Sequence, residues 1–283
     1  MKVDLHIHST FSDGSFTPEQ VVETAIDIGI NAISITDHDN VISYNVANEF
    51  VKLNNLDVEL IPGVEINTIW KHEEIHILGY YMDMTDKSFK EMLINQQHAR
   101  VNQTHKIVDL ISKKAGIPIT FDHIKNYVTA GGSIGRPHIA KAIVNAGGAR
   151  NVMEAYSKYI NDNSPVYVQR ETVTPHDAVE IIYEAGGIPV IAHPCDINNA
   201  EKLVTDLMNY GLRGVEAYHR KHSPAMVEYY SSLAEKYDLI VTGGSDFHGL
   251  NMSNQIVMGK NFIPEWVLGK LKNEKNRIEI AGI

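Results

Sequence analysis

The sequence predicts an α/β fold in which a largely parallel sheet closes, or nearly closes, into a barrel. Short apolar runs typical of strands alternate with helical stretches along most of the 283 residues. A histidine or a carboxylate follows almost every one of these runs. Barrel enzymes gather such side chains at the carboxyl ends of their strands, so a barrel accounts for both observations.

Each expected strand is a short apolar run that ends in polar residues. In chain order these runs cover residues 2–8, 32–37, 58–66, 75–81, 188–193, 214–218 and 239–243. Helices are expected between many of them, at residues 17–29, 174–185, 200–210 and 224–237. Thr17 and Pro18 match an N-cap followed by a proline in the first turn, and Gly29 suits the helix end.

The middle of the chain interrupts this alternation. A long helix is expected over residues 86–116, with Phe89, Leu93 and Ile107 among its apolar positions. After it, short helical pieces alternate with glycine and polar residues, and no clear barrel strand occurs before Tyr167. We therefore expect a barrel domain formed by residues 1–100 and 167–283, and a small helical insertion domain at residues 101–166.

Composition limits the possible partners and the compartment. A formal net charge of −10 argues against broad adhesion to nucleic acid or to an anionic membrane. It leaves a phosphate substrate open, because bound divalent cations can reverse the local potential. No apolar run is long enough to span a bilayer, and no stable protein partner is predicted. The single cysteine, Cys195, favours a reducing cytoplasm and a packing role for that thiol.

The side chains at the strand ends form a set suited to metal binding. They are His6, His8 and Asp13 at the first strand, Asp37, His38 and Asp39 at the second, Glu65 at the third, His76 at the fourth, His193 at the fifth, and Asp246 and His248 after the last. Burying so many ionisable groups without partners costs several kcal/mol each. A shared metal centre removes that cost.

The spacing within the set has a physical logic. His6 and His8 are two residues apart, so on a strand they face the same way and can clamp one ion. Asp246 and His248 can share an ion or each hold a different one, and Glu65 is the best candidate for a bridging carboxylate. With nitrogen and oxygen donors only, the set suits manganese, iron or zinc better than magnesium. We expect two to three divalent cations, manganese first, with Fe²⁺ or Zn²⁺ as alternatives.

Read in order, the motifs resemble the PHP (polymerase and histidinol phosphatase) family. The matching segments are Asp4-Leu5-His6-Ile7-His8-Ser9, Ser12-Asp13-Gly14, Thr36-Asp37-His38-Asp39, Gly63-Val64-Glu65, His76, Ala192-His193-Pro194 and Gly244-Ser245-Asp246-Phe247-His248. The resemblance implies a distorted (β/α)7 barrel and a metal-dependent hydrolase of phosphoric esters.

The same resemblance implies three metal positions. The first ion is assigned to His6, His8, Glu65 and Asp246. The second is assigned to Glu65, His76 and His193, and the third to Asp13, His38 and His248. All nine positions hold competent ligands, which argues against the alternative of a non-catalytic binding module.

The insertion and the segment Gly135-Arg136-Pro137-His138 resemble one branch of the family. That branch contains nucleoside 3′,5′-bisphosphate phosphatases and members that trim RNA from the 5′ end. Tyr167-Val168 and Glu216-Ala217-Tyr218 also fit it. Two residues depart from the pattern: Cys195 stands where relatives often carry glycine or a polar residue, and Asn163 stands where lysine or arginine is common.

The reaction expected from the resemblance is hydrolysis of a phosphomonoester, specifically the 3′-phosphate of nucleoside 3′,5′-bisphosphates, with short RNA 5′ ends as further substrates. Glu65, Asp246 and His222 are the expected catalytic residues. Arg136, His138 and His222 are expected to bind the substrate. The two histidines would donate hydrogen bonds to the phosphate or protonate the leaving group. A salt bridge between insertion and barrel is the alternative role for Arg136.

Other basic side chains receive ordinary roles. Arg100 and Arg170 are weaker candidates for phosphate contact and are expected instead to be solvated helix or loop charges. Surface or capping roles are expected for the histidines outside the motifs, which are His98, His105, His123, His176 and His219.

Two rival functions remain. His72-Glu73-Glu74-Ile75-His76 matches the H-E-x-x-H pattern of zinc metalloproteases, which requires both histidines on one helical face. This segment leads into an expected strand, where four residues span about 13 Å, too far for one zinc ion. The short link from Glu65 to His76 suggests a hairpin instead. Histidinol-phosphate phosphatase is the second rival, because the metal ligands do not distinguish leaving groups.

Overall fold

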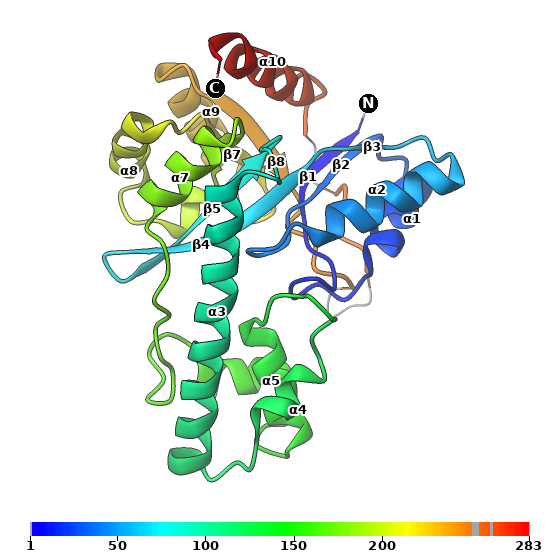
Figure 1. The fold of residues 1–283 in the computed structure, drawn as a ribbon. Helices are drawn as coiled ribbons and strands as arrows, with labels where there is room; N and C mark the ends of the chain where they lie inside the picture. The colour runs from blue at the N-terminus through cyan, green and yellow to red at the C-terminus, as the bar shows by residue number, and fades with distance from the viewer. Residues whose placement is uncertain (1, 251–254, 261–262, 283) are drawn as a thin grey trace.

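Two hydrogen-bonded sheets carry the α/β fold of the computed structural model, which describes residues 2–250, 255–260 and 263–282 (Figure 1). The first sheet is parallel and has the order β1 (Val3–Ile7), β2 (Ala32–Ile35), β3 (Glu59–Leu60). The second has the order β4 (Gly63–Trp70), β5 (Glu73–Tyr80), β6 (Ile188–Ile191), β7 (Gly214–His219), β8 (Ile240–Gly244). β5 runs antiparallel to both of its neighbours, and the other pairs are parallel.

The two sheets approach each other at both edges without merging into one continuous ladder. An isolated parallel bridge joins Ile7 of β1 to Phe247 beyond β8, and another joins His38 beyond β2 to Glu65 of β4. The α/β class is confirmed. Among the described strands, however, the expected (β/α)7 ring is an open pair of sheets linked by single bridges. Both bridges lie beside predicted metal ligands.

The expected strand at residues 58–66 is divided into two strands, and the expected hairpin between Glu65 and His76 is present. The run at residues 58–66 is divided between β3 and β4 at Pro62, which has no N–H to donate to a ladder. β4 and β5 form a hairpin whose turn residues Lys71 and His72 have φ values of 49° and 71°. His72 and His76 therefore lie on a turn and a strand, which contradicts the helical geometry of a metalloprotease motif.

Helices cover the outer faces of the sheets. They are α1 (Pro18–Asp27), α2 (Ile42–Asn54), α7 (Pro175–Glu184), α8 (Ala200–Leu207), α9 (Pro224–Lys236) and α10 (Trp266–Ala281), with 3₁₀ turns at Pro194–Asp196 and Met208–Tyr210. α1 begins as predicted, since the Thr17 side chain accepts a hydrogen bond from the Gln20 N–H and Pro18 opens the first turn.

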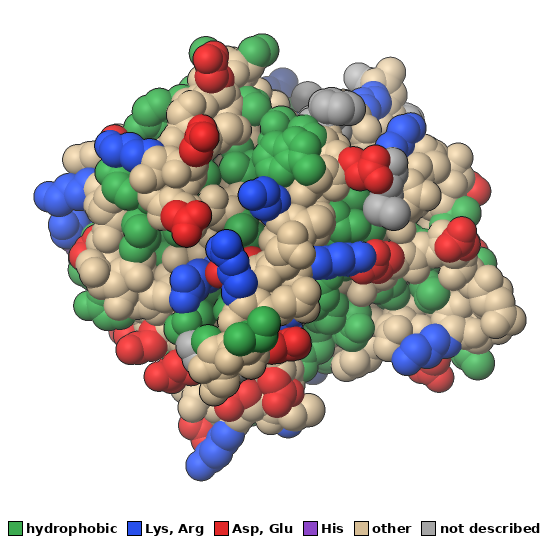
Figure 2. Space-filling view, turned by 90° about the horizontal axis from the view of Figure 1, so that it is seen from above, with side chains coloured by type: hydrophobic (Ala, Val, Ile, Leu, Met, Phe, Trp, Pro, Cys, Tyr) green, Lys and Arg blue, Asp and Glu red, His purple; other side chains and the backbone are tan. Residues whose placement is uncertain are grey.

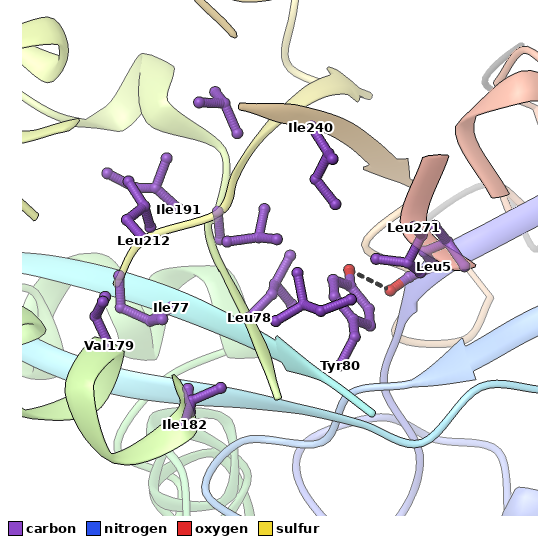
Figure 3. Packing of buried hydrophobic residues seen from close by; sticks show 14 of the residues in the cluster. Leu5, Ile77, Leu78, Tyr80, Val179, Ile182, Ile191, Leu212, Ile240 and Leu271 are labelled. Atoms are coloured by element: carbon purple, nitrogen blue, oxygen red, sulfur yellow. Dashed lines mark hydrogen bonds between the residues drawn. The ribbon is translucent and has the colours of Figure 1, made fainter. Parts of the chain in front are cut away.

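The main apolar core lies between the second sheet and its helices (Figure 3). Ile77 and Leu78 of β5 are fully buried, as are Val179 and Ile182 of α7. Tyr80 joins this core to the first sheet, because its hydroxyl donates a 2.9 Å hydrogen bond to the carbonyl oxygen of Leu5 in β1. The core thus fixes β5 and β1, the two strands that carry His76 and His6.

Residues between β5 and α7 form a helical unit with an apolar cluster of its own. It contains α3 (Lys87–Leu110), α4 (Phe121–Lys125), α5 (Arg136–Asn145) and α6 (Val152–Ala155), with π-helical turns at Ile111–Ala115 and Tyr156–Ile160. The expected long helix is confirmed as α3, and α4 and α5 lie beside its far half (Figure 1). The proposed domain boundary at residue 100 falls inside this continuous helix, so α3 belongs to both units.

The surface that bears α10 has mixed charge. Figure 2 shows basic and acidic side chains interspersed on this face, with hydrophobic side chains between them. The acidic net charge of the chain therefore does not form a single patch on the face in view. No helix among the described residues is long and apolar enough to cross a membrane.

Replacing Leu78 with alanine should lower the free energy of unfolding by roughly 2–5 kcal/mol, because the fully buried side chain leaves a cavity. Leu53→Ala is the matched control, since Leu53 is 74% exposed and its loss should change stability by less than about 0.5 kcal/mol. Urea unfolding followed by circular dichroism measures both. Equal stability losses would contradict the assigned core.

Candidate metal centre

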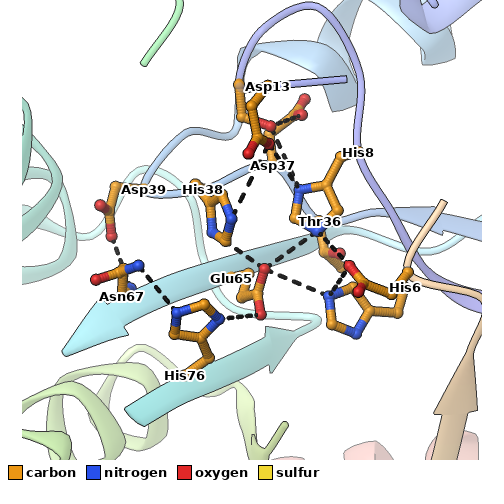
Figure 4. Close-up of polar contacts among 12 residues, drawn as sticks. His6, His8, Asp13, Thr36, Asp37, His38, Asp39, Glu65, Asn67 and His76 are labelled. Carbon is orange, nitrogen blue, oxygen red and sulfur yellow. Dashed lines mark hydrogen bonds and ion pairs between the residues drawn. The ribbon is translucent and has the colours of Figure 1, made fainter. Parts of the chain in front are cut away.

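The structure brings all nine predicted metal ligands to one site. Figure 4 shows the part of it formed by His6, His8, Asp13, His38, Glu65 and His76. The nine ligands come from strands and strand ends on both sheets: His6, His8 and Asp13 from β1 and the loop beyond it, His38 from the end of β2, Glu65 from β4, His76 from β5, His193 after β6, and Asp246 and His248 after β8. The convergence at these strand ends is the arrangement that the sequence predicts. The assignment of each ligand to an ion stays a prediction.

One oxygen of Glu65 faces three imidazoles. Its Oε2 lies 3.3 Å from Nε2 of His6, 3.1 Å from Nε2 of His8 and 3.0 Å from Nδ1 of His38. The carboxylate is buried, and β4 holds it at the centre of the group (Figure 4).

The other oxygen of Glu65 faces a different pair. Oε1 lies 2.7 Å from Nδ1 of His76 and 3.2 Å from Nε2 of His193. A carboxylate whose two oxygens face separate histidine sets has the geometry of a bridge between two cations. This geometry supports the bridging role expected for Glu65.

A second cluster lies next to Glu65. The Oδ1 atom of Asp13 is 3.3 Å from Nε2 of His248 and 4.0 Å from Nε2 of His38. Because Nδ1 of His38 faces Glu65 while Nε2 faces Asp13, His38 lies between two clusters. His8 is similarly placed, with Nδ1 3.9 Å from Asp13 and Nε2 3.4 Å from Oδ1 of Asp246.

The polar atoms of the site fit divalent cations. The buried atoms Nε2 of His6, Nε2 of His8, Nδ1 of His38, Oε2 of Glu65 and Oδ1 of Asp13 have no hydrogen-bond partner. Buried polar atoms without partners are costly, and atoms that converge on shared points are satisfied by a cation. All the donors are nitrogen or oxygen, which fits manganese, iron or zinc.

The charged neighbours of Glu65 favour its ionised form, which is the form that binds cations. Burial disfavours ionisation of Glu65, but His38 and His6 hold the pKa of this carboxyl well below its ordinary value. Burial alone lowers the pKa of an imidazole, and for His38 it prevails and brings the pKa to about 3. In His76 the neighbouring Glu65 outweighs burial and raises the pKa to about 10.

Unusual backbone conformations surround the site. Asp39, His193 and Asp246 have φ values of 51°, 26° and 50°, in the left-handed region that non-glycine residues rarely adopt. Such conformations persist where the surrounding structure enforces them, and they cluster at functional sites. Gly244 allows β1 to pass close by, because a Cβ atom there would collide with the backbone and Cβ of His6.

A cavity of about 630 Å³ opens from the cluster toward the helical unit. The predicted ligands Asp13, His38, Glu65, His76 and His193 form part of its wall. The opposite wall comes mainly from the helical unit and the segment after it, and includes Arg100, Arg136, Tyr156, Tyr167 and Arg170. Three guanidinium groups therefore line the space beside the predicted metal centre.

The expectation that Arg100 and Arg170 are solvated is wrong. They are only 6% and 8% exposed. Nε of Arg100 donates to Oδ2 of Asp39 at 2.7 Å, and Arg170 donates to Oδ1 of Asn67 at 2.5 Å. The buried Asp39 carboxylate requires positive partners, and its nearness to α3 is a tertiary feature that helix periodicity does not reveal.

Arg136 makes the salt bridge that was the alternative to phosphate binding. Its guanidinium pairs with Glu74 on β5 of the barrel and, at 2.8 Å, with Asp162. Its Cζ atom lies 5.6 Å from the centroid of the Tyr156 ring and 5.8 Å from the centroid of the Tyr167 ring. Arg136 also lines the cavity, so contact with a phosphate stays a prediction.

Neither His138 nor His222 is among the side chains that line the described cavity. His138 caps α5, where its Nδ1 accepts a hydrogen bond from the Gly135 N–H at 2.9 Å. His222 donates from Nδ1 to the carbonyl oxygen of Ala217 at 2.8 Å. Their substrate roles stay predictions.

Two residues of β7 reach the site although neither was expected there. Glu216 is fully buried against His6, and the expected surface role of His219 is wrong, because it is 3% exposed and lies beside Asp246. His219 directly follows the expected strand, a position that already signalled other ligands. The four other histidines outside the motifs lie elsewhere: His98, His105 and His123 are exposed, and His176 pairs with Asp206.

Comparison with known proteins identifies the family. The PHP domain model matches residues 4–178. The chain belongs to the PHP family. The resemblance carried by the ligand motifs is thereby confirmed.

PHP relatives with assigned activities align over most of their length. The 5′-3′ exoribonuclease Rnm of Escherichia coli is 34% identical over 249 residues, which cover 87% of this chain and 84% of that protein. The 3′,5′-nucleoside bisphosphate phosphatase of Chromobacterium violaceum is 28% identical, with 87% of each chain covered.

Two solved structures show the same fold. A protein from Bifidobacterium adolescentis, assigned as a metal-dependent phosphoesterase, has a TM-score of 0.86 and 30% identity, with 95% of this chain and 94% of that chain covered. A Chromobacterium violaceum protein described as an amidohydrolase, with bound sulfate and no metal, has a TM-score of 0.84 and 26% identity, with 96% of each chain covered.

Glu65→Ala should remove the carboxylate that faces both histidine sets, and should abolish turnover and weaken Mn²⁺ binding while the fold stays intact. Glu184→Ala, at an exposed position on α7, is the control and should bind Mn²⁺ as the wild type does. Calorimetric titration of metal-free protein with Mn²⁺ and a phosphatase assay test the pair. Near-normal binding and turnover in Glu65→Ala would remove Glu65 from the centre.

Proposed function

We propose that this PHP protein hydrolyses phosphomonoesters, specifically the 3′-phosphate of nucleoside 3′,5′-bisphosphates, to give a nucleoside 5′-phosphate and inorganic phosphate. The broader class rests on its family and relatives, since the chain is a metal-dependent phosphoesterase, a hydrolase of phosphoester bonds. The substrate is the proposed part.

A single observation carries the proposal. The predicted ligands Asp13, His38 and Glu65, each with a buried atom that lacks a hydrogen-bond partner, line a cavity whose other wall holds Arg100, Arg136 and Arg170. Guanidinium groups and divalent cations are both strong binders of phosphoryl oxygens. With cations bound, a phosphate ester between these walls would meet them on one side and the guanidinium of Arg136 on the other, since Arg100 and Arg170 already face Asp39 and Asn67.

The roles of the chain's residues follow from this placement. The nine predicted ligands would hold divalent cations, which would supply Lewis acidity and positive charge to phosphoryl oxygens and lower the pKa of water. Glu65 fixes the spacing of the two histidine sets that it faces. Arg136 orients the phosphate once the substrate's charge competes with Glu74 and Asp162 for the guanidinium. Asp246 also lines the cavity and keeps its predicted catalytic role, whereas His222 lies outside the lining, so its catalytic role stays a prediction that this placement does not support.

The aromatic side chains of the cavity favour a nucleotide. Tyr156 and Tyr167 line the same wall as Arg136, and both rings lie close to its guanidinium. Tyrosine rings stack on nucleobases with little preference for the base. A relative assigned as a 3′,5′-nucleoside bisphosphate phosphatase agrees with this choice.

Release of nucleotides from the 5′ end of short RNA is the second candidate. It is favoured by the 34% identity to the Escherichia coli 5′-3′ exoribonuclease. The net charge of −10 predicts weak affinity for long polymers, because their binding depends on phosphate neutralisation by basic groups. Short oligonucleotides are therefore the expected RNA substrates.

The direct test is phosphate release by Mn²⁺-loaded protein from adenosine 3′,5′-bisphosphate and from histidinol phosphate, measured side by side. The bisphosphate should be hydrolysed faster, and AMP should appear in equal amount to phosphate. A 5′-phosphorylated RNA pentamer analysed in parallel tests the second candidate. A preference for histidinol phosphate would overturn the nucleotide assignment.

Arg136→Ala should raise KM for the bisphosphate by about 10- to 100-fold, the value of a charge-assisted hydrogen bond of roughly 1.5–3 kcal/mol. Arg136→Lys keeps the charge but not the planar fork and should restore only part of the affinity. Arg150→Ala, an exposed arginine of the same helical unit, is the control. An unchanged KM in Arg136→Ala would leave Arg136 with its salt bridges alone.

A further inference from the structure

β7 supplies none of the nine predicted ligands, yet it runs directly behind them. Glu216 and His219 of this strand are buried against His6 and Asp246. They also form, with His6, a group whose donor atoms lie within 4.8 Å of one another. Such a group can be a further cation site or a support for the ligands in front of it, and the hydrogen bonds distinguish the two.

An irregularity in β7 turns both side chains toward the site. Glu216 pairs with Thr242 of β8 and Tyr218 pairs with Gly243, so Ala217 is an extra residue in the ladder. Side chains normally alternate along a strand, which would point residues 216 and 219 to opposite faces. The bulge resets this alternation, so both residues face the metal centre.

Both oxygens of the Glu216 carboxylate accept hydrogen bonds from predicted metal ligands. Its Oε1 accepts a 2.9 Å hydrogen bond from Nδ1 of His6. Its Oε2 accepts a 2.8 Å hydrogen bond from the backbone N–H of His193. Because an ionised carboxylate can only accept, the His6 proton stays on Nδ1 and Nε2 is presented to Glu65.

The second of these bonds holds a strained backbone. His193 has φ 26° and ψ 60°, a conformation that non-glycine residues adopt only where it is enforced. The Glu216 bond anchors its N–H in that conformation, from which the ring reaches Oε1 of Glu65. One buried carboxylate thus positions a predicted ligand of the first ion and one of the second.

His219 packs against a third predicted ligand, Asp246, without hydrogen-bonding to it. The Lys221 N–H donates to Nδ1 of His219 at 3.3 Å, which leaves the proton of the neutral ring on Nε2. That Nε2 lies 3.5 Å from Oδ2 of Asp246 without a hydrogen bond between them, and Arg220 donates to the same oxygen at 3.0 Å. Oδ1 of Asp246 is left facing the His6 and His8 rings.

We propose that Glu216 and His219 are positioning residues of the metal centre, which fix the ring of His6, the backbone of His193 and the carboxylate of Asp246 from behind. This inference rests on the proposed metal-dependent activity but is tested by metal binding, so the two can fail separately. Outer partners of metal ligands typically contribute 10- to 100-fold to affinity or activity.

Glu216→Gln is the discriminating variant. The amide keeps the volume of the carboxylate, but its NH₂ group faces either His6 Nδ1 or the His193 N–H, so one of the two hydrogen bonds is lost. Titration of metal-free protein with Mn²⁺ should give a dissociation constant raised about 10- to 100-fold for at least one ion. The thermal midpoint of the metal-free variant should stay close to that of the wild type.

Two further variants complete the test. Glu274→Gln removes another buried glutamate, on α10, and should bind Mn²⁺ as the wild type does. His219→Leu should weaken binding, and His219→Gln, which retains a donor toward Asp246, should restore part of it. These two variants keep the proposal testable if Glu216→Gln does not fold.

Wild-type affinities in Glu216→Gln and His219→Leu would overturn the proposal. Loss of one whole equivalent of Mn²⁺ with unchanged affinity for the others would also overturn it, in favour of a further cation site at Glu216. A wild-type protein that binds Mn²⁺ tightly but hydrolyses no phosphoester would sink the proposed function and leave the positioning role intact.

Discussion

The burial of one carboxylate, Glu65, is the constraint on which the site depends. A carboxylate removed from water requires positive partners, and imidazoles surround both of its oxygens. Those imidazoles come from strands of both sheets, so the sheets must keep their mutual position to satisfy it. The bridge between His38 and Glu65 places a backbone link at that point. The metal centre therefore depends on the mutual position of the two sheets.

Much of this arrangement could be predicted from sequence because local rules govern it. Strand ends, helix caps and the hairpin before His76 follow from apolar runs, proline and turn chemistry. Ligand identity follows because burying so many histidines and carboxylates at strand ends is favourable only around shared cations. The division of residues 58–66 at Pro62 was missed, although proline signals it. The failures at Arg100 and Arg170 are of another kind, because their burial depends on Asp39, which lies about sixty residues away from Arg100 along the chain.

The residues behind the ligands were missed for a related reason. Periodicity assigns Glu216 and His219 to opposite faces of β7, and only the bulge at Ala217 brings them together. A bulge is set by the pairing of two strands, which a single sequence does not display. The sequence thus revealed the metal ligands, because histidines and carboxylates at strand ends are unusual. It did not reveal Glu216 and His219, whose importance comes from where the bulge places them.

The continuity of α3 constrains how the helical unit can vary. Its 24 residues span about 36 Å, from the barrel core at Phe89 to the helical unit, and Gln96 and Arg100 contact Asp39 between the two. A loop connection would tolerate insertions, but one added residue within a helix rotates everything beyond it by about 100°. Length changes between Gln96 and the apolar cluster would therefore turn the cavity wall away from the barrel. Loops at the far end of the helical unit can therefore change in length, whereas the number of residues in the near half of α3 is fixed by the contacts at both of its ends.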